Sequence, residues 1–165
     1  MNVHGGARFA PATYLSNLAK GVAPDTLKLV TQTELLQALR LELDGHPALD
    51  FALLFGSWAR DRARPDSDVD VAVMPRGQWS LGAELDLQGR LERTLGASVD
   101  LVRLDQAPLL LAWEVVSGGL PICGEHSALV RYQASIALEH ADAGPALERA
   151  ARQYARRIAE LGVPV

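Results

Sequence analysis

The sequence contains very little cysteine and no long apolar run. Its single cysteine, Cys123, can form neither an intrachain disulfide framework nor a cysteine-based zinc cage. We therefore expect a protein of a reducing compartment. The longest apolar run, residues 107–113, is far shorter than the roughly 20 residues needed to cross a bilayer. The sequence therefore predicts no membrane span.

The chain also lacks an excess of positive charge. It carries 16 basic and 20 acidic residues, a formal net charge of −4, which argues against a protein that holds nucleic acid by bulk phosphate attraction alone. Residues 1–21 mix His4, Arg8 and Lys20 into apolar stretches and never build the unbroken core of a signal peptide. We therefore expect a cytoplasmic location. The four histidines fall at no recognised metal-ligand spacing.

The apolar content, in contrast, is sufficient for one folded domain. Of 165 residues, 48% are apolar, and a chain of this length buries about 68–70% of the surface that its unfolded form exposes. We expect three parts: a poorly defined lead-in over residues 1–28, a core over residues 29–125, and C-terminal helices over residues 126–165 that pack on the same domain. A short helix around residues 14–19 is expected within the lead-in.

The core alternates helical and strand patterns, which indicates an α/β (α+β) domain. Thr31 and Glu34 have capping-box spacing before an apolar helical stripe. The patterns predict strands at residues 51–55, 69–75, 98–104 and 120–123, and further helices at residues 58–62, 81–95 and 107–116. In the C-terminal part, Gly144 and Pro145 interrupt the helical pattern, so two helices are expected there.

Chemistry-bearing residues gather between the first two strands. Gly56 and Ser57 end a wholly apolar strand, and after ten residues Asp68 and Asp70 begin the next. Aspartates at i and i+2 of a strand project from one face, where they can hold one or two hard divalent cations. Glycine lets a phosphate approach the backbone, and a serine that starts a short helix offers a hydroxyl and an amide. The pattern predicts a metal–phosphate site.

A structural reading of the same residues is simpler. Gly-Ser turns and pairs of surface aspartates are common, and D-x-D alone is weak evidence for a site. The conjunction favours the functional reading, because a buried strand leads directly into Gly-Ser and the carboxylates follow a loop rich in arginine.

Residues 54–60 together with residues 67–71 resemble the G-S-x10-D-x-D signature of minimal nucleotidyltransferases of the DNA polymerase beta superfamily. These are best known as the MNT antitoxins of HEPN/MNT toxin–antitoxin pairs. The resemblance covers about residues 31–125. It implies a small mixed β-sheet of the nucleotidyltransferase type with helices packed on it. It also implies a third carboxylate on the neighbouring strand, and Asp100 matches that position.

Site residues follow from the resemblance. Asp68 and Asp70 would hold two Mg²⁺ ions, and Asp100 would complete the first metal site and accept a proton. The proposed nucleotide contacts are Gly56, Ser57, Arg60 and Ser67. Three rivals for the third carboxylate are Asp86, Asp105 and Glu114, of which Asp105 is expected to cap the following helix.

The sequence departs from the family pattern at Asp61, where the family usually has glycine. This residue puts activity in doubt more than fold, because it adds a side chain and a charge near the nucleotide. The resemblance implies transfer of AMP from ATP to a hydroxyl, namely a tyrosine of a partner HEPN toxin. The alternatives are a non-catalytic module that binds nucleotide or sequesters the toxin, and a nucleotidyltransferase that modifies small-molecule antibiotics.

Overall fold

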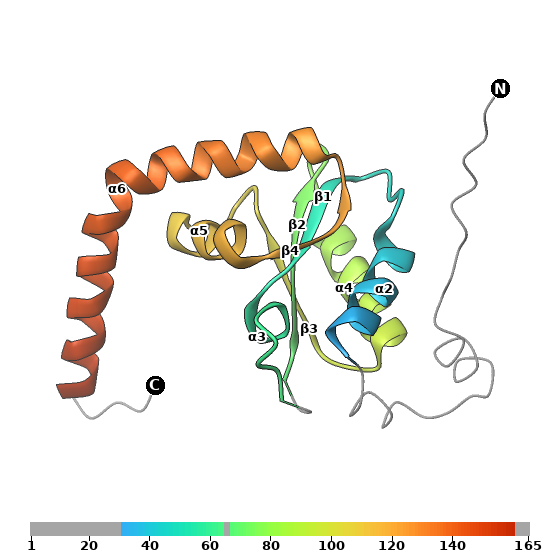
Figure 1. Cartoon of the computed structure of the whole chain (residues 1–165), viewed down its shortest axis with the longest axis horizontal. Coiled ribbons are helices and arrows are strands. Elements are labelled where there is room, and N and C mark those ends of the chain that lie inside the picture. Colours follow the sequence, from blue (N-terminus) through green and yellow to red (C-terminus); the bar gives the residue numbers. More distant parts are fainter. Residues whose placement is uncertain (1–30, 65–66, 161–165) are drawn as a thin grey trace.

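A computed structural model describes residues 31–64 and 67–160, and its centre is a four-stranded mixed sheet (Figure 1). The strands are β1 (Leu49–Leu54), β2 (Val69–Pro75), β3 (Val99–Arg103) and β4 (Leu120–Gly124). They lie in the order β3-β2-β1-β4, with β1 antiparallel to both neighbours and β2 parallel to β3. The expected mixed sheet is confirmed. The helix predicted at residues 14–19 lies outside the described residues.

Helices cover both faces of this sheet. On one face lie α2 (Gln32–Leu43) and α4 (Leu81–Leu95), and on the other lie α5 (Leu109–Gly118) and the first part of α6 (His126–Glu160), as Figure 1 shows. A single turn, α3 (Gly56–Ala59), follows β1 directly. The predicted short helix therefore begins and ends earlier than expected, because the glycine itself starts the turn.

Alternation along β2 divides the core and orients the candidate site. Val69, Val71 and Val73 are buried against α2 and α4, whereas Ala72 belongs to the cluster on the α5 side. Because side chains of a strand alternate between faces, Asp70 lies on the α5 face. The valines thus fix the direction of the carboxylate.

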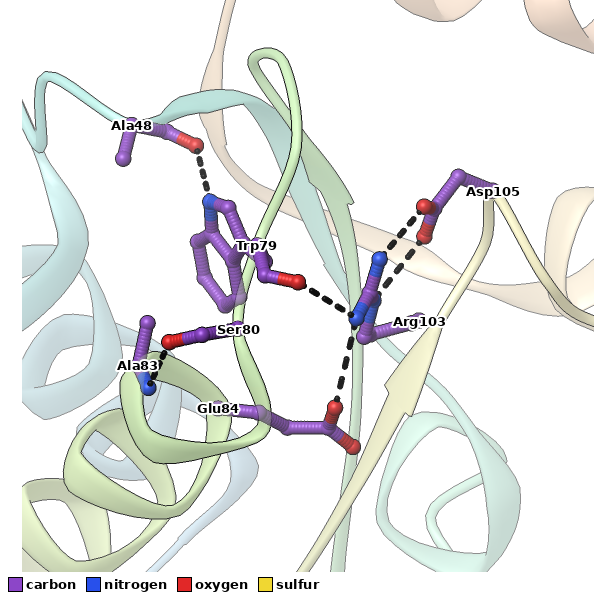
Figure 2. A network of polar contacts seen from close by, with 7 residues as sticks. All are labelled: Ala48, Trp79, Ser80, Ala83, Glu84, Arg103 and Asp105. Carbon is purple, nitrogen blue, oxygen red and sulfur yellow. Dashed lines mark hydrogen bonds and ion pairs between the residues drawn. The ribbon is translucent and has the colours of Figure 1, made fainter.

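Local signals decide where the helices begin and end. Both halves of the capping box between Thr31 and Glu34 are present, and Gly96 ends α4 in the left-handed conformation. The prediction for Asp105 was wrong, because α5 begins at Leu109 with no side-chain cap. The Asp105 carboxylate binds the guanidinium of Arg103 instead, at 2.7 and 3.1 Å (Figure 2). The Asp105 carboxylate therefore pairs with the Arg103 guanidinium rather than with the backbone amides of α5.

The C-terminal segment forms one helix rather than the two predicted. Pro145 lies inside α6, and Figure 1 shows the helix bending sharply along its length. A proline removes one amide and clashes with the preceding turn, which kinks a helix without necessarily ending it. Before the bend, Leu129 and Ile136 are buried, while the part beyond it stands apart from the sheet (Figure 1). Within the described ranges, no helix is long and apolar enough to span a membrane.

Candidate active site

The turn from β1 into α3 lies against the carboxylate of Asp70. Gly56 has a φ of +67°, and a Cβ placed on it would overlap with Asp70 Oδ2 and stand 2.7 Å from Asp70 Cγ. The backbone N–H of Phe55 also donates to the Asp70 carbonyl at 3.0 Å. Only glycine satisfies both this backbone conformation and this close approach.

Two further aspartates, Asp68 and Asp100, lie near Asp70. Asp100 on β3 is the register partner of Asp70 on β2, and because these strands are parallel the two side chains lie on the same face. Burial raises the pKa of Asp70, and the negative charges of Asp100 and Asp68 raise it further. The Ser57 backbone N–H, which donates to the Asp70 carboxylate, acts in the opposite direction. The site therefore concentrates negative charge that a cation would neutralise.

The chemistry of these donors suits Mg²⁺. Carboxylate oxygens are hard ligands, and Mg²⁺ is commonly held by one or two carboxylates together with substrate phosphates and water. In residues 31–64 and 67–160, no three His, Cys, Asp or Glu side chains lie where they could hold a metal ion together. An ion bound by these aspartates would therefore need ligands from outside the protein, such as phosphate oxygens or water.

The loop after α3 places the other predicted contacts. Ser67 accepts a hydrogen bond from the Arg64 N–H at 2.8 Å, and its carbonyl accepts one from the Trp58 indole at 3.5 Å. Its side chain therefore holds the loop closed. Arg60 forms an ion pair with Glu114 of α5. Trp58 packs on the α2/α4 core cluster.

Asp61 adopts a φ of +54°, which side chains rarely occupy. The family glycine at this position therefore has a backbone reason, and aspartate tolerates the left-handed region better than most residues. Its side chain is exposed. The departure from the family pattern leaves the turn in place.

Sequence reasoning missed the contribution of Glu114. The sequence offers Glu114 only as a rival third metal carboxylate, whereas the structure pairs it with Arg60, and its charge also raises the pKa of Asp70. No sequence spacing signals this pair, because 54 residues separate the partners. Of the other rivals, Asp105 lies beyond the opposite end of β3 from Asp100, in the network of Figure 2. Asp86 lies exposed on α4.

Known proteins match this chain in sequence. Residues 37–127 match the family model described as polymerase beta, nucleotidyltransferase. The protein adenylyltransferase MntA of Shewanella oneidensis is 30% identical over 98 residues, which cover 59% of this chain and 68% of the relative.

Solved structures share the fold. A toxin–antitoxin crystal structure with AMP-PNP aligns with a TM-score of 0.58 and 23% identity, covering 73% of this chain and 98% of that one. A structure of a tri-AMPylated HEPN toxin of Shewanella oneidensis in complex with MNT antitoxin also aligns. Its matched chain has a TM-score of 0.52 and 23% identity, and the alignment covers 72% of this chain and 94% of that one. The family match spans the sheet, the Gly56 turn and all three aspartates, and the chain belongs to the polymerase beta family of nucleotidyltransferases.

Proposed function

We propose that this nucleotidyltransferase transfers AMP from ATP to a hydroxyl, with Mg²⁺ bound by Asp68, Asp70 and Asp100. The observation that carries the proposal is the close approach of the Asp70 carboxylate to Gly56, with Asp100 in register beside it. It brings hard oxygen ligands next to a turn whose backbone a phosphate can approach. Residues 29–125 form the proposed catalytic unit, and residues 126–165 its C-terminal helical part.

The reaction joins the acceptor oxygen to the α-phosphorus of ATP. The bond from the α-phosphorus to the bridging oxygen of the β-phosphate breaks, and pyrophosphate leaves. Asp100 accepts the proton of the attacking hydroxyl. Magnesium, when bound, lowers the pKa of that hydroxyl and stabilises the charge on the leaving group.

Nucleotide contacts come from the turn and its loop. The Gly56 backbone and the Ser57 hydroxyl hold the triphosphate, and Arg60 adds a guanidinium. Ser67 already accepts a hydrogen bond from the Arg64 N–H, but its own O–H can still donate to a phosphate. The loop can therefore remain closed when nucleotide binds.

For the acceptor, we propose a tyrosine of a helical HEPN toxin, which would make this protein the antitoxin of a pair. The support is the relative described as a protein adenylyltransferase and the structural neighbours that are toxin–antitoxin complexes, one of them with an AMPylated toxin. We expect both partners in the cytoplasm.

Labelled ATP tests the proposal. The full chain is incubated with α-labelled ATP, Mg²⁺ and the product of the adjacent gene as the candidate toxin. We expect label on the toxin that survives denaturation. It should not form when EDTA is present during the reaction, and it should be absent when the acceptor tyrosine is changed to phenylalanine. Tight toxin binding without transfer would favour a sequestering module instead. Label on an aminoglycoside rather than on the protein would favour an antibiotic-modifying enzyme.

A further inference from the structure

One ion pair links the nucleotide turn to the helix that covers it. The Nη2 of Arg60, the residue that ends α3, donates to the Oε1 of Glu114 on α5. Each side chain is 49% exposed, so an isolated pair of this kind would contribute little to stability. Its position suggests a role other than stabilising the fold.

The backbone around Glu114 is firmly held. Val115 is fully buried, and Trp113 stacks on His140 of α6 with ring centroids 4.3 Å apart and planes 9° apart. Because its neighbours on both sides are anchored, Glu114 presents its carboxylate from a rigid helix. Arg60 itself follows a single helical turn, which offers much less support.

The pair also stands beside the metal carboxylates. Arg60 ends the turn that begins at Gly56, and Gly56 lies directly against the Asp70 carboxylate. A second acidic group here would weaken the binding of a triphosphate unless a cation compensated for it. Arg60 supplies that cation.

The guanidinium has donors left over. Arginine carries five N–H donors in a planar fork, and Glu114 engages Nη2. Among the described residues, no other acceptor is found for the Arg60 side chain. The Nε and Nη1 donors therefore remain for a second anion.

We propose that Glu114 is a positioning residue, which holds Arg60 by one nitrogen so that its remaining donors meet the phosphates of a bound nucleoside triphosphate. The inference rests on the proposed function, because it deepens the account of that same site. Glu114 acts only through Arg60. The negative charge of Glu114 by itself opposes nucleotide binding. A purely electrostatic role therefore predicts that removing Glu114 raises nucleotide affinity, whereas a positioning role predicts that removing it lowers nucleotide affinity.

Calorimetric titration with Mg²⁺ and a non-hydrolysable ATP analogue tests this sign. Glu114→Ala frees a long side chain that must then be ordered on binding, so affinity should fall roughly 3- to 10-fold. Glu114→Gln keeps an oxygen for Nη2 and removes the charge, so it should bind at least as tightly as the original protein. In an Arg60→Ala background, Glu114→Ala should no longer weaken binding. Unchanged or tighter binding by Glu114→Ala alone, or equal weakening in both backgrounds, overturns the proposal.

Two controls separate this inference from the fold and from the proposed function. Asp86→Ala removes an exposed carboxylate from α4 and should leave nucleotide affinity unchanged. Side-chain NMR of Arg60 in the nucleotide-free protein needs no ligand: its Nε–H should be ordered in the original chain and mobile in Glu114→Ala. Equal mobility in both overturns the positioning role. If the original chain binds no nucleotide, the proposed function fails, whereas the NMR comparison still decides what Glu114 does.

Discussion

The Asp70 carboxylate occupies the space that a side chain at Gly56 would need. The turn that follows β1 thus meets β2 where a backbone without a side chain contacts a carboxylate. This contact ties the turn after β1 to strand β2, so that displacing one displaces the other.

Replacing Gly56 by alanine should therefore abolish activity. The left-handed backbone alone costs about 1–2 kcal/mol with a side chain present, and the added methyl group also pushes Asp70 away. Gly45→Ala is the matched control, because Gly45 has a similar φ of +71° but no atom within 4 Å of the added Cβ. Thermal unfolding and nucleotide titration of both variants measure the two effects. Equal nucleotide affinity in the two variants would contradict the contact with Asp70.

The double substitution Asp68→Asn with Asp70→Asn should abolish transfer without unfolding the protein. Both side chains lie at the start of β2, outside the buried core, and transfer should fall on the order of 1,000-fold or more. Mg²⁺-dependent transfer at the original rate would end the assignment of these residues as metal ligands.

Stability of that double variant should not fall and can rise. Burial and like charges raise the folded-state pKa of Asp70 above its ordinary value of 3.8. The contribution of Asp70 to the stability of the folded state is therefore fully present below pH 3.8 and is lost as the pH rises through the raised pKa. At neutral pH the charged side chain therefore opposes folding, and asparagine removes the cost. Melting temperatures in EDTA at pH 4 and pH 7 test this: the gain from substitution should be larger at pH 7.

Asp105→Ala should loosen the fold and spare catalysis. It removes the two hydrogen bonds that the Arg103 guanidinium donates to this carboxylate, and leaves contacts to Glu84 and the Trp79 carbonyl. We expect a melting temperature lower by a few degrees and unchanged nucleotide affinity, because this network lies at the far end of β3 from Asp100. Loss of transfer in a folded Asp105→Ala protein, with transfer retained in Asp100→Ala, would reverse the choice of third carboxylate.

Asp61→Gly should stabilise the protein by up to about 1 kcal/mol, since glycine adopts a φ of +54° without strain but gains entropy in the unfolded chain. Asp61→Ala is the contrast, because it keeps the strain and removes the charge. Urea unfolding of both variants separates backbone from charge. A less stable glycine variant would show that the aspartate side chain itself supports the turn.

Cys123 should be nearly inert to alkylation at pH 8. Burial and the nearby Asp44 charge raise the pKa of this thiol from 9.0 to about 11, and the thiolate is the reactive form. Stability should fall as pH rises from about 9 towards 11, where the unfolded chain loses the proton that the folded chain retains. Iodoacetamide labelling with and without urea, and unfolding of Cys123→Ala across this range, measure both effects. Labelling at the unfolded rate would contradict the burial of the thiol.

Much of the fold could be predicted because the decisive signals are local. The bounds of β2 and α4 agree with prediction, since Pro75 ends the strand and Gly96 ends the helix. Two of the errors came from competition that local patterns do not contain. Pro145 bends α6 without ending it, and Asp105 prefers a cation two residues away to the amides of α5.

The candidate site likewise has a part that local sequence predicts and a part that depends on contacts between distant segments. The spacing of Gly56, Asp68 and Asp70 is written in one short segment, and the structure brings Gly56 against Asp70. The partner of Arg60 could not be predicted, because Glu114 reaches it only after two further strands and a helix have been arranged. Motif spacing is therefore readable from the sequence, whereas an ion pair between two distant segments is not.

The parallel pairing of β2 and β3 through α4 has a consequence for how the protein folds. Asp68, Asp70 and Asp100 all belong to this one β–α–β unit, so the cluster forms as soon as a short stretch of chain closes on itself. Closing this unit brings like charges together, and their repulsion opposes the pairing of β2 with β3. We therefore expect divalent ions in the refolding buffer to accelerate the step that forms this unit, and refolding rates with Mg²⁺ and with EDTA measure the effect.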